Sequence, residues 1–191
     1  MIPVRVEASR ASRTGVWVGI AAITMTFTAF TSAFVVRQGS GTDWIHFRIP
    51  ALLYVNTLIL LASSGALELA RPRMTRAAAL GDAPAQGAST WVAVTLGLGL
   101  LFVCGQVLAW RNLVAQGLVL ATGPSNAFFY VFTVVHALHV LGGIAGLIYL
   151  LRRLGQVPAS LAEPVYGATA LYWHFMAVLW LYLLLLLTVR L

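Results

Sequence analysis

The chain has 191 residues, of which 60% are hydrophobic and only 9% are charged, and its formal net charge is +7. This composition lies far outside the range of soluble domains, so it predicts an integral membrane protein without a soluble domain. All 12 basic residues are Arg, and nearly all of them flank apolar stretches. The positive charge therefore indicates membrane orientation and lipid contact, not nucleic-acid binding.

Five apolar stretches divide the chain into membrane-spanning helices and connecting loops. At about 1.5 Å per residue, each stretch is long enough to cross a hydrocarbon core of roughly 30 Å. We therefore predict an all-α, polytopic membrane protein in which residues 1–191 form a single transmembrane domain. The predicted helices cover residues 14–36, 49–70, 89–110, 125–151 and 165–189.

The segments outside these helices set the expected orientation. The first helix follows a basic start, but its apolar stretch is longer than the 7 to 15 residues or so of a signal-peptide core, so we expect it to be retained. The loop at 71–88 is rich in Ala, Gly and Pro and is expected to be flexible. Eight Arg fall on one side of the membrane and four on the other, which predicts a cytoplasmic N-terminus and an external C-terminus.

The acidic residues all lie at or beyond the ends of the predicted helices. Because a chain that carried protons across the membrane by itself would keep acidic groups at depth, their placement argues against a pump or antiporter. No repeat is visible either, which disfavours an inverted-repeat transporter. The five acids are Glu7, Asp43, Glu68, Asp82 and Glu163.

The first and third helices carry small residues for which packing roles are expected. Hydroxyl side chains of the first helix can return hydrogen bonds to their own helix, as is usual within membranes. The single cysteine, Cys104, lies in an apolar stretch and predicts a buried, inert residue without disulfide or metal chemistry. The hydroxyl residues are Thr24, Thr26, Thr28, Thr31 and Ser32.

The fourth helix concentrates histidine and glycine on one side. His136 and His139 are three residues apart, and Gly142, Gly143 and Gly146 follow one to two turns later. Imidazole facing lipid is unfavourable, and glycine is useful where another backbone comes close. We therefore expect this side to contact protein.

The fifth helix places Trp173 and His174 deeper than an interfacial aromatic belt requires, so both are expected to pack against neighbouring helices. The imidazoles of His139 and His174 could alternatively ligate a b-type haem, as in a small cytochrome b-like electron carrier. Helix-bridging hydrogen bonds are the simpler interpretation, because only one loose pair is available. A haem-copper or two-metal centre would need more ligands than this chain embeds.

Arg152 and Arg153 close the fourth helix on its predicted cytoplasmic side. A guanidinium group can hold a lipid phosphate through two hydrogen bonds, so both are candidates for binding a lipid headgroup. Their alternative role is simple positive charge flanking a membrane span.

Two motifs in this order resemble a known family. PSNAFFYVFTVVHALHVLGG at 124–143 is similar to a His-Gly-Leu-His-Val-x-Gly-Gly core, and YWHFMAVLW at 172–180 is similar to a Trp-His-Phe-x-Asp-x-x-Trp signature. Both belong to subunit III of the haem-copper respiratory oxidases, the cytochrome c and quinol oxidases. The stretches 15–27 and 50–64 resemble its first and second common helices, and CGQVLAWRNL at 104–113 fits its third more loosely.

The resemblance implies the short, five-helix bacterial form of subunit III, in a bacterial inner membrane. It implies an accessory subunit with no redox centre or cofactor of its own. Such a subunit docks on subunit I, which carries haem and copper, in a complex with subunit II. It binds phospholipid between its helices, stabilises the active site during turnover and supports proton uptake while oxygen is reduced to water.

The chain departs from the family pattern at three positions where the family has acids. Ile23 stands in the first helix, Ala109 in the third and Ala177 in the last motif. Each replacement is apolar, so a direct role in proton delivery is not expected from these positions. A subunit III-like accessory of a nitric oxide reductase, or of another respiratory complex, is a further alternative.

Overall fold

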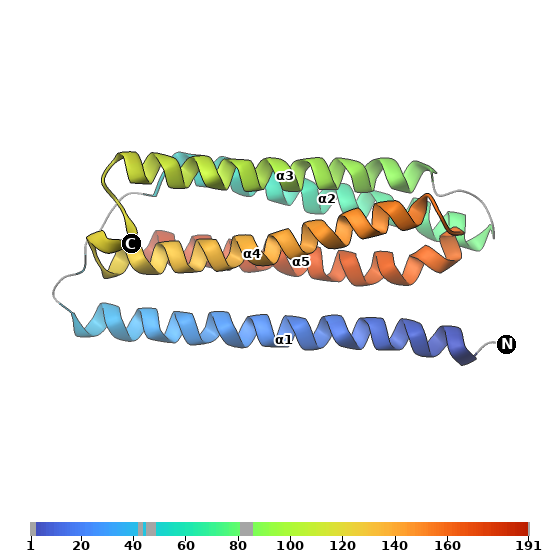
Figure 1. Ribbon diagram of the computed structural model, residues 1–191, viewed down its shortest axis with the longest axis horizontal. Helices are drawn as coiled ribbons and strands as arrows, with labels where there is room; N and C mark the ends of the chain where they lie inside the picture. Colours follow the sequence, from blue (N-terminus) through green and yellow to red (C-terminus); the bar gives the residue numbers. More distant parts are fainter. Residues whose placement is uncertain (1–2, 42–43, 45–48, 81–85, 191) are drawn as a thin grey trace.

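The computed structural model describes residues 3–41, 44, 49–80 and 86–190, and the described chain is all-α (Figure 1). Each of the five long helices includes an apolar stretch long enough to cross a membrane, which confirms the predicted fold class. A short 3-10 helix, η1, at Leu120–Thr122 precedes the fourth long helix. The long helices are α1 at Pro3–Ser40, α2 at Ala51–Ala79, α3 at Gln86–Ala115, α4 at Pro124–Leu154 and α5 at Ala159–Arg190.

The helices extend further than the apolar stretches predict, and the clearest case is α2. Its last turns, through Ala79, occupy much of the segment expected to be a flexible loop. Pro72 lies inside the helix even though proline removes one backbone hydrogen bond. Met74 and Ala77 are buried against the rest of the molecule, and the alanines that follow are strong helix formers. Tertiary packing and local propensity therefore carry α2 past the proline.

Four helices form a closed bundle, and α1 lies against its side (Figure 1). Within the bundle, α2 packs on α3 and α5, and α4 packs on α3 and α5. Among the described residues, α1 contacts α5 and α4 but neither α2 nor α3. The most buried of the five spans is α5, which packs on α1, α2 and α4.

Aromatic side chains hold α1 against α4. The ring centroids of Phe27 and Phe132 lie 6.4 Å apart, and those of Phe34 and Phe132 lie 5.8 Å apart. These contacts fall within the range of favourable aromatic pairs. Four threonines of α1 bond carbonyl groups one turn earlier in the same helix, as expected: Thr24, Thr26, Thr28 and Thr31.

Candidate functional site: two polar clusters on the fifth helix

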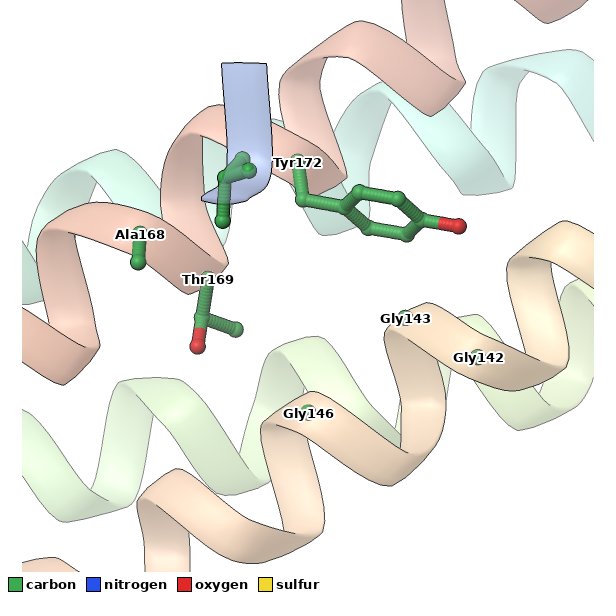
Figure 2. Close-up of a pocket in the computed structure, with 7 residues that line it drawn as sticks. Gly142, Gly143, Gly146, Ala168, Thr169 and Tyr172 are labelled. Atoms are coloured by element: carbon green, nitrogen blue, oxygen red, sulfur yellow. The ribbon is translucent and has the colours of Figure 1, made fainter. Parts of the chain in front are cut away.

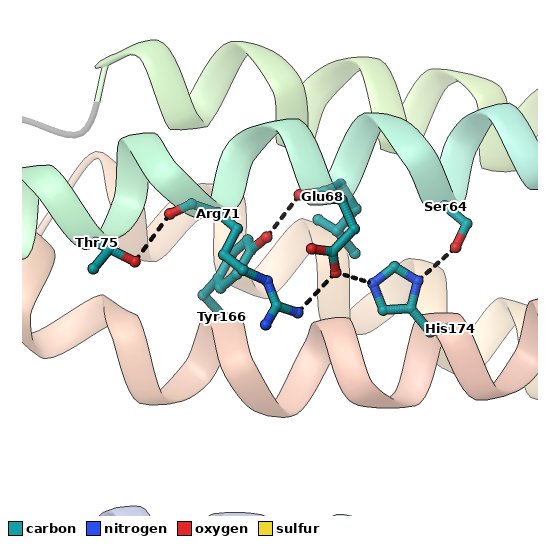
Figure 3. A network of polar contacts seen from close by, with 7 residues as sticks. Ser64, Glu68, Arg71, Thr75, Tyr166 and His174 are labelled. Atoms are coloured by element: carbon teal, nitrogen blue, oxygen red, sulfur yellow. Dashed lines mark hydrogen bonds and ion pairs between the residues drawn. The ribbon is translucent and has the colours of Figure 1, made fainter.

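The first polar cluster joins α2 to α5 around His174, as Figure 3 shows. Nε2 of His174 donates to Oε1 of Glu68 over 2.6 Å, so in the neutral ring Nδ1 accepts the hydroxyl hydrogen of Ser64 over 2.5 Å. Arg71 donates to the same carboxylate oxygen over 2.7 Å. Ser64, Glu68, Arg71 and His174 are called the His174 network below. Spacings of four and three residues place its α2 members on one face of that helix.

Glu68 corrects the expectation that all acids lie at the ends of the membrane helices. Because α2 continues to Ala79, about three turns of helix follow Glu68. The carboxylate also lies at the depth of His174, which is well inside α5. The apolar stretch ends near Glu68 but α2 does not, so the end of the apolar stretch was mistaken for the end of the helix.

A pocket of about 360 Å³ opens beside the His174 network. Arg71 and His174 line it together with Trp17 of α1, and Tyr166 lies in its wall. The Tyr166 hydroxyl donates to the backbone oxygen of Leu67 over 2.6 Å, which adds a second polar tie between α5 and α2. The remaining lining residues are Met74, Thr75, Glu163, Gly167 and Leu171. This pocket therefore combines a cationic guanidinium with apolar side chains in its lining.

The second polar cluster surrounds His136, which is 0% exposed inside the four-helix bundle. Its ring lies 4.9 Å from the Trp180 ring of α5 and 6.1 Å from the Phe102 ring of α3. The buried amides Asn56 of α2 and Gln106 of α3 belong to the same level of the bundle. Asn56, Phe102, Gln106, His136 and Trp180 are called the His136 layer below.

The two histidines proposed as haem ligands point to different sides of the bundle. The His139 ring lies 6.0 Å from Phe27 of α1, and its Nδ1 donates to the backbone oxygen of Val135 over 2.7 Å. His174 faces α2, where Ser64 and Glu68 engage both of its ring nitrogens. The structure does not bring the pair together, so their geometry does not suit a haem held between them.

The three glycines of α4 differ in what they contact. A Cβ added to Gly143 would lie 2.9 Å from the Trp173 ring of α5, so this position requires glycine for close approach. Gly142 and Gly146 meet nothing closer than 3.6 Å. Together the three glycines line a pocket of about 260 Å³ between α1, α4 and α5, facing Tyr172 and Thr169 (Figure 2). Ala168 and Val16 complete its lining.

The other predicted residues are placed as follows. Trp173 is wholly buried and donates to Ser63 of α2 over 3.2 Å. Arg153 donates to the hydroxyl of Tyr149 one turn earlier, and Arg152 is exposed at the same helix end. The three positions at which the resemblance led us to expect acids are all buried: Ile23, Ala109 and Ala177.

The expectation for Cys104 is wrong, because its side chain is exposed on the outside of the bundle. Lipid is as apolar as a protein core, so an apolar stretch does not reveal which of its faces is buried. Sequence reasoning also missed Ser64, Asn56 and Gln106. The sequence does mark these three residues, because each is a polar side chain inside an otherwise apolar stretch.

The fold and the two polar clusters identify the class of protein: a polytopic helical membrane bundle in which embedded polar side chains connect neighbouring helices. Among the described residues, no group of three or more His, Cys, Asp or Glu side chains is placed to hold a metal ion. The chain matches the family model described as cytochrome c oxidase subunit III over residues 13–189. It therefore belongs to the cytochrome c oxidase subunit III family.

Individual relatives agree with this membership. A protein of Mycobacterium bovis called probable cytochrome c oxidase subunit 3 is 32% identical over 158 residues, covering 80% of this chain and 74% of the relative. Cytochrome c oxidase subunit 3 of Corynebacterium diphtheriae is 30% identical, covering 80% and 72%. Quinol oxidase subunit 3 of Bacillus subtilis is 27% identical, covering 93% and 86%.

Proposed function

We propose that this chain, an accessory subunit III of a haem-copper oxidase, serves aerobic electron transport by stabilising the catalytic subunit and retaining phospholipid. The observation that carries the proposal is the family match over residues 13–189. The five-helix bundle supports it, because its embedded histidines, His174 above all, serve helix contacts. The chain's partners are then subunit I, which carries haem and copper, and subunit II.

The proposed location is the bacterial inner membrane, with the N-terminus in the cytoplasm and the C-terminus outside. The bacterial relatives and the distribution of Arg support this location and orientation. Ile23, Ala109 and Ala177 are apolar and buried, so these positions offer no proton carrier. The proposed contribution of this chain is therefore support of the partner by contact, and not proton delivery through these three positions.

Phospholipid is the ligand proposed for the groove beside Arg71. The guanidinium has five N–H donors and uses them on Glu68 and on the neighbouring Tyr166 side chain, which leaves donors suited to a phosphate. Trp17 and Leu171 line the same groove and suit an acyl chain. Arg152 and Arg153 are a second candidate site for a lipid headgroup. The pocket lined by Gly142, Gly143 and Gly146 is a candidate site for an acyl chain.

Lipid retention is tested by counting phospholipid in purified complexes by mass spectrometry. Arg71→Gln is expected to reduce tightly bound anionic lipid, whereas Arg76→Gln, at an exposed position further along α2, is the matched control. Arg152→Ala combined with Arg153→Ala tests the second candidate in the same assay. Equal lipid content in all four preparations would refute lipid binding at both places.

Stabilisation is tested by comparing oxidase purified with and without this chain. We expect the depleted enzyme to begin with similar oxygen consumption but to lose activity faster during continuous turnover. Adding the purified chain back should slow that loss. Identical decay of the two preparations would contradict the proposed role.

A further inference from the structure

The His136 layer crosses all four helices of the bundle at one level. Nδ2 of Asn56 donates to the backbone oxygen of Phe102 over 2.9 Å, which ties α2 to α3. The Phe102 ring lies 5.2 Å from the Trp180 ring, which in turn lies against His136. Trp180 also donates to Thr57, the neighbour of Asn56, over 2.9 Å. The layer is thus a closed ring of contacts through α2, α3, α5 and α4.

Gln106 belongs to this layer by its place on α3. It follows Phe102 by four residues, so the two share one face of the helix. One further turn along, Trp110 donates to Thr133 of α4 over 3.1 Å. Gln106 therefore lies between two α3 residues that both contact α4, next to the turn that carries His136.

Five polar atoms of this layer have no hydrogen-bond partner among the described protein atoms: Oδ1 of Asn56, Oε1 and Nε2 of Gln106, and Nδ1 and Nε2 of His136. The three side chains are at most 1% exposed, so neither lipid headgroups nor bulk solvent reach them. Oδ1 of Asn56 points at α3, where it lies against Gly105, the neighbour of Gln106.

The energetics distinguish two ways of satisfying these atoms. A direct hydrogen bond between Gln106 and His136 would pair two of the five atoms, leaving three at about 1–3 kcal/mol each. A buried water molecule makes about three hydrogen bonds, both donating and accepting, and occurs where polar groups converge. Water is therefore the better partner for a set that contains both donors and acceptors.

We propose that the His136 layer is a buried water-binding site, in which at least one water molecule bridges Gln106 and His136 within the membrane-embedded core. The inference concerns only the interior of this chain and is independent of which complex the chain joins. At this one level the otherwise apolar bundle then contains water, which Phe102 and Trp180 enclose.

The test is X-ray radiolysis of the complex that carries the tagged chain, in oxygen-18-labelled water, with side-chain oxidation read by mass spectrometry. Radicals formed from a bound water oxidise the side chains beside it. Trp180 and Trp173 form a matched pair, because both lie on α5 and both are 0% exposed. They differ in their surroundings: Trp180 lies against His136, whereas Trp173 donates to Ser63, whose hydroxyl already has a backbone partner. We expect Trp180 to be oxidised severalfold faster than Trp173.

Variants then test whether the oxidation of Trp180 depends on water bound in the His136 layer. In Gln106→Leu with His136→Leu, oxidation of Trp180 should fall to the rate of Trp173, and Gln106→Leu alone serves if the double variant does not assemble. Equal rates for the two tryptophans in the unmodified chain would overturn the proposal and show a dry core. Fast oxidation of Trp180 that persists in the variants would also overturn it, because the water would then be bound elsewhere.

Discussion

The His174 network and the His136 layer both include a side chain of α5, His174 and Trp180 respectively, about two turns apart along that helix, but their polar groups are satisfied differently. In the His174 network every ring nitrogen has a protein partner, and the carboxylate remains 45% exposed beside a groove. In the His136 layer the imidazole is wholly buried and neither nitrogen has a partner among the described protein atoms. The first cluster is therefore suited to meeting lipid or a partner, and the second to holding the bundle's interior.

This difference shows that depth along a helix does not determine a residue's surroundings. Both histidines lie in apolar stretches, yet one faces an open groove between α2 and α5 and the other faces the centre of four helices. They lie on different helices, His136 on α4 and His174 on α5, and the direction in which each side chain points determines what surrounds it. We expect substitutions in the interior to disturb stability strongly and substitutions in the groove to disturb it little.

The largest effect is expected from Gly143→Leu, between α4 and α5. The added side chain would collide with the Trp173 ring, because even a Cβ comes within 2.9 Å. Overpacking a core commonly destabilises by about 1–3 kcal/mol, and a leucine at this contact should reach the upper part of that range. Thermal unfolding of the detergent-solubilised complex and the amount of chain that it retains would measure the effect.

Gly142→Leu is the matched control, since a Cβ there meets nothing closer than 3.6 Å. It should leave stability and subunit stoichiometry nearly unchanged. If both variants behave alike, close approach at Gly143 is not what holds α4 to α5.

A smaller effect is expected from Gly105→Ala, which acts directly on the His136 layer. The new Cβ would press on the amide of Asn56 and disturb its bond to Phe102. The same change at Gly97, also on α3, meets nothing within 4 Å and is the control. We expect a loss of about 1 kcal/mol or somewhat more for Gly105→Ala and no loss for Gly97→Ala, measured by thermal unfolding. A loss at Gly97 as large as at Gly105 would contradict the account of this layer.

The smallest effect is expected from Glu68→Gln in the His174 network. Exposed charge pairs are screened by their surroundings and contribute at most about 1 kcal/mol, and glutamine retains an oxygen for His174. Glu163→Gln, at an exposed acid lining the same groove, is the control. A loss of stability as large as that of Gly105→Ala would show that the His174 network is part of the interior after all.

Much of the fold followed from the sequence, because five apolar stretches of sufficient length permit little other than a helical bundle. The helix ends did not follow, since Pro72 and the arginines of α2 look like a loop until packing at Met74 is known. Hydropathy treats burial in lipid and burial in protein alike, which is why Cys104 was misplaced. The pairing of Glu68 with His174 needed the register of α2 against α5, which no single helix encodes.

Whether this chain serves as a haem-free subunit of a haem-copper oxidase is tested by a mild-detergent pull-down of the tagged chain from its native membranes, with mass spectrometry and a visible absorption spectrum of the eluate. We expect a haem-copper catalytic subunit and its copper-bearing partner in equal amounts with the chain. We also expect haem absorbance that stays with the catalytic subunit when the complex is taken apart. Three results would contradict this role: the chain elutes alone, it elutes with a complex that lacks a haem-copper subunit, or it carries haem of its own.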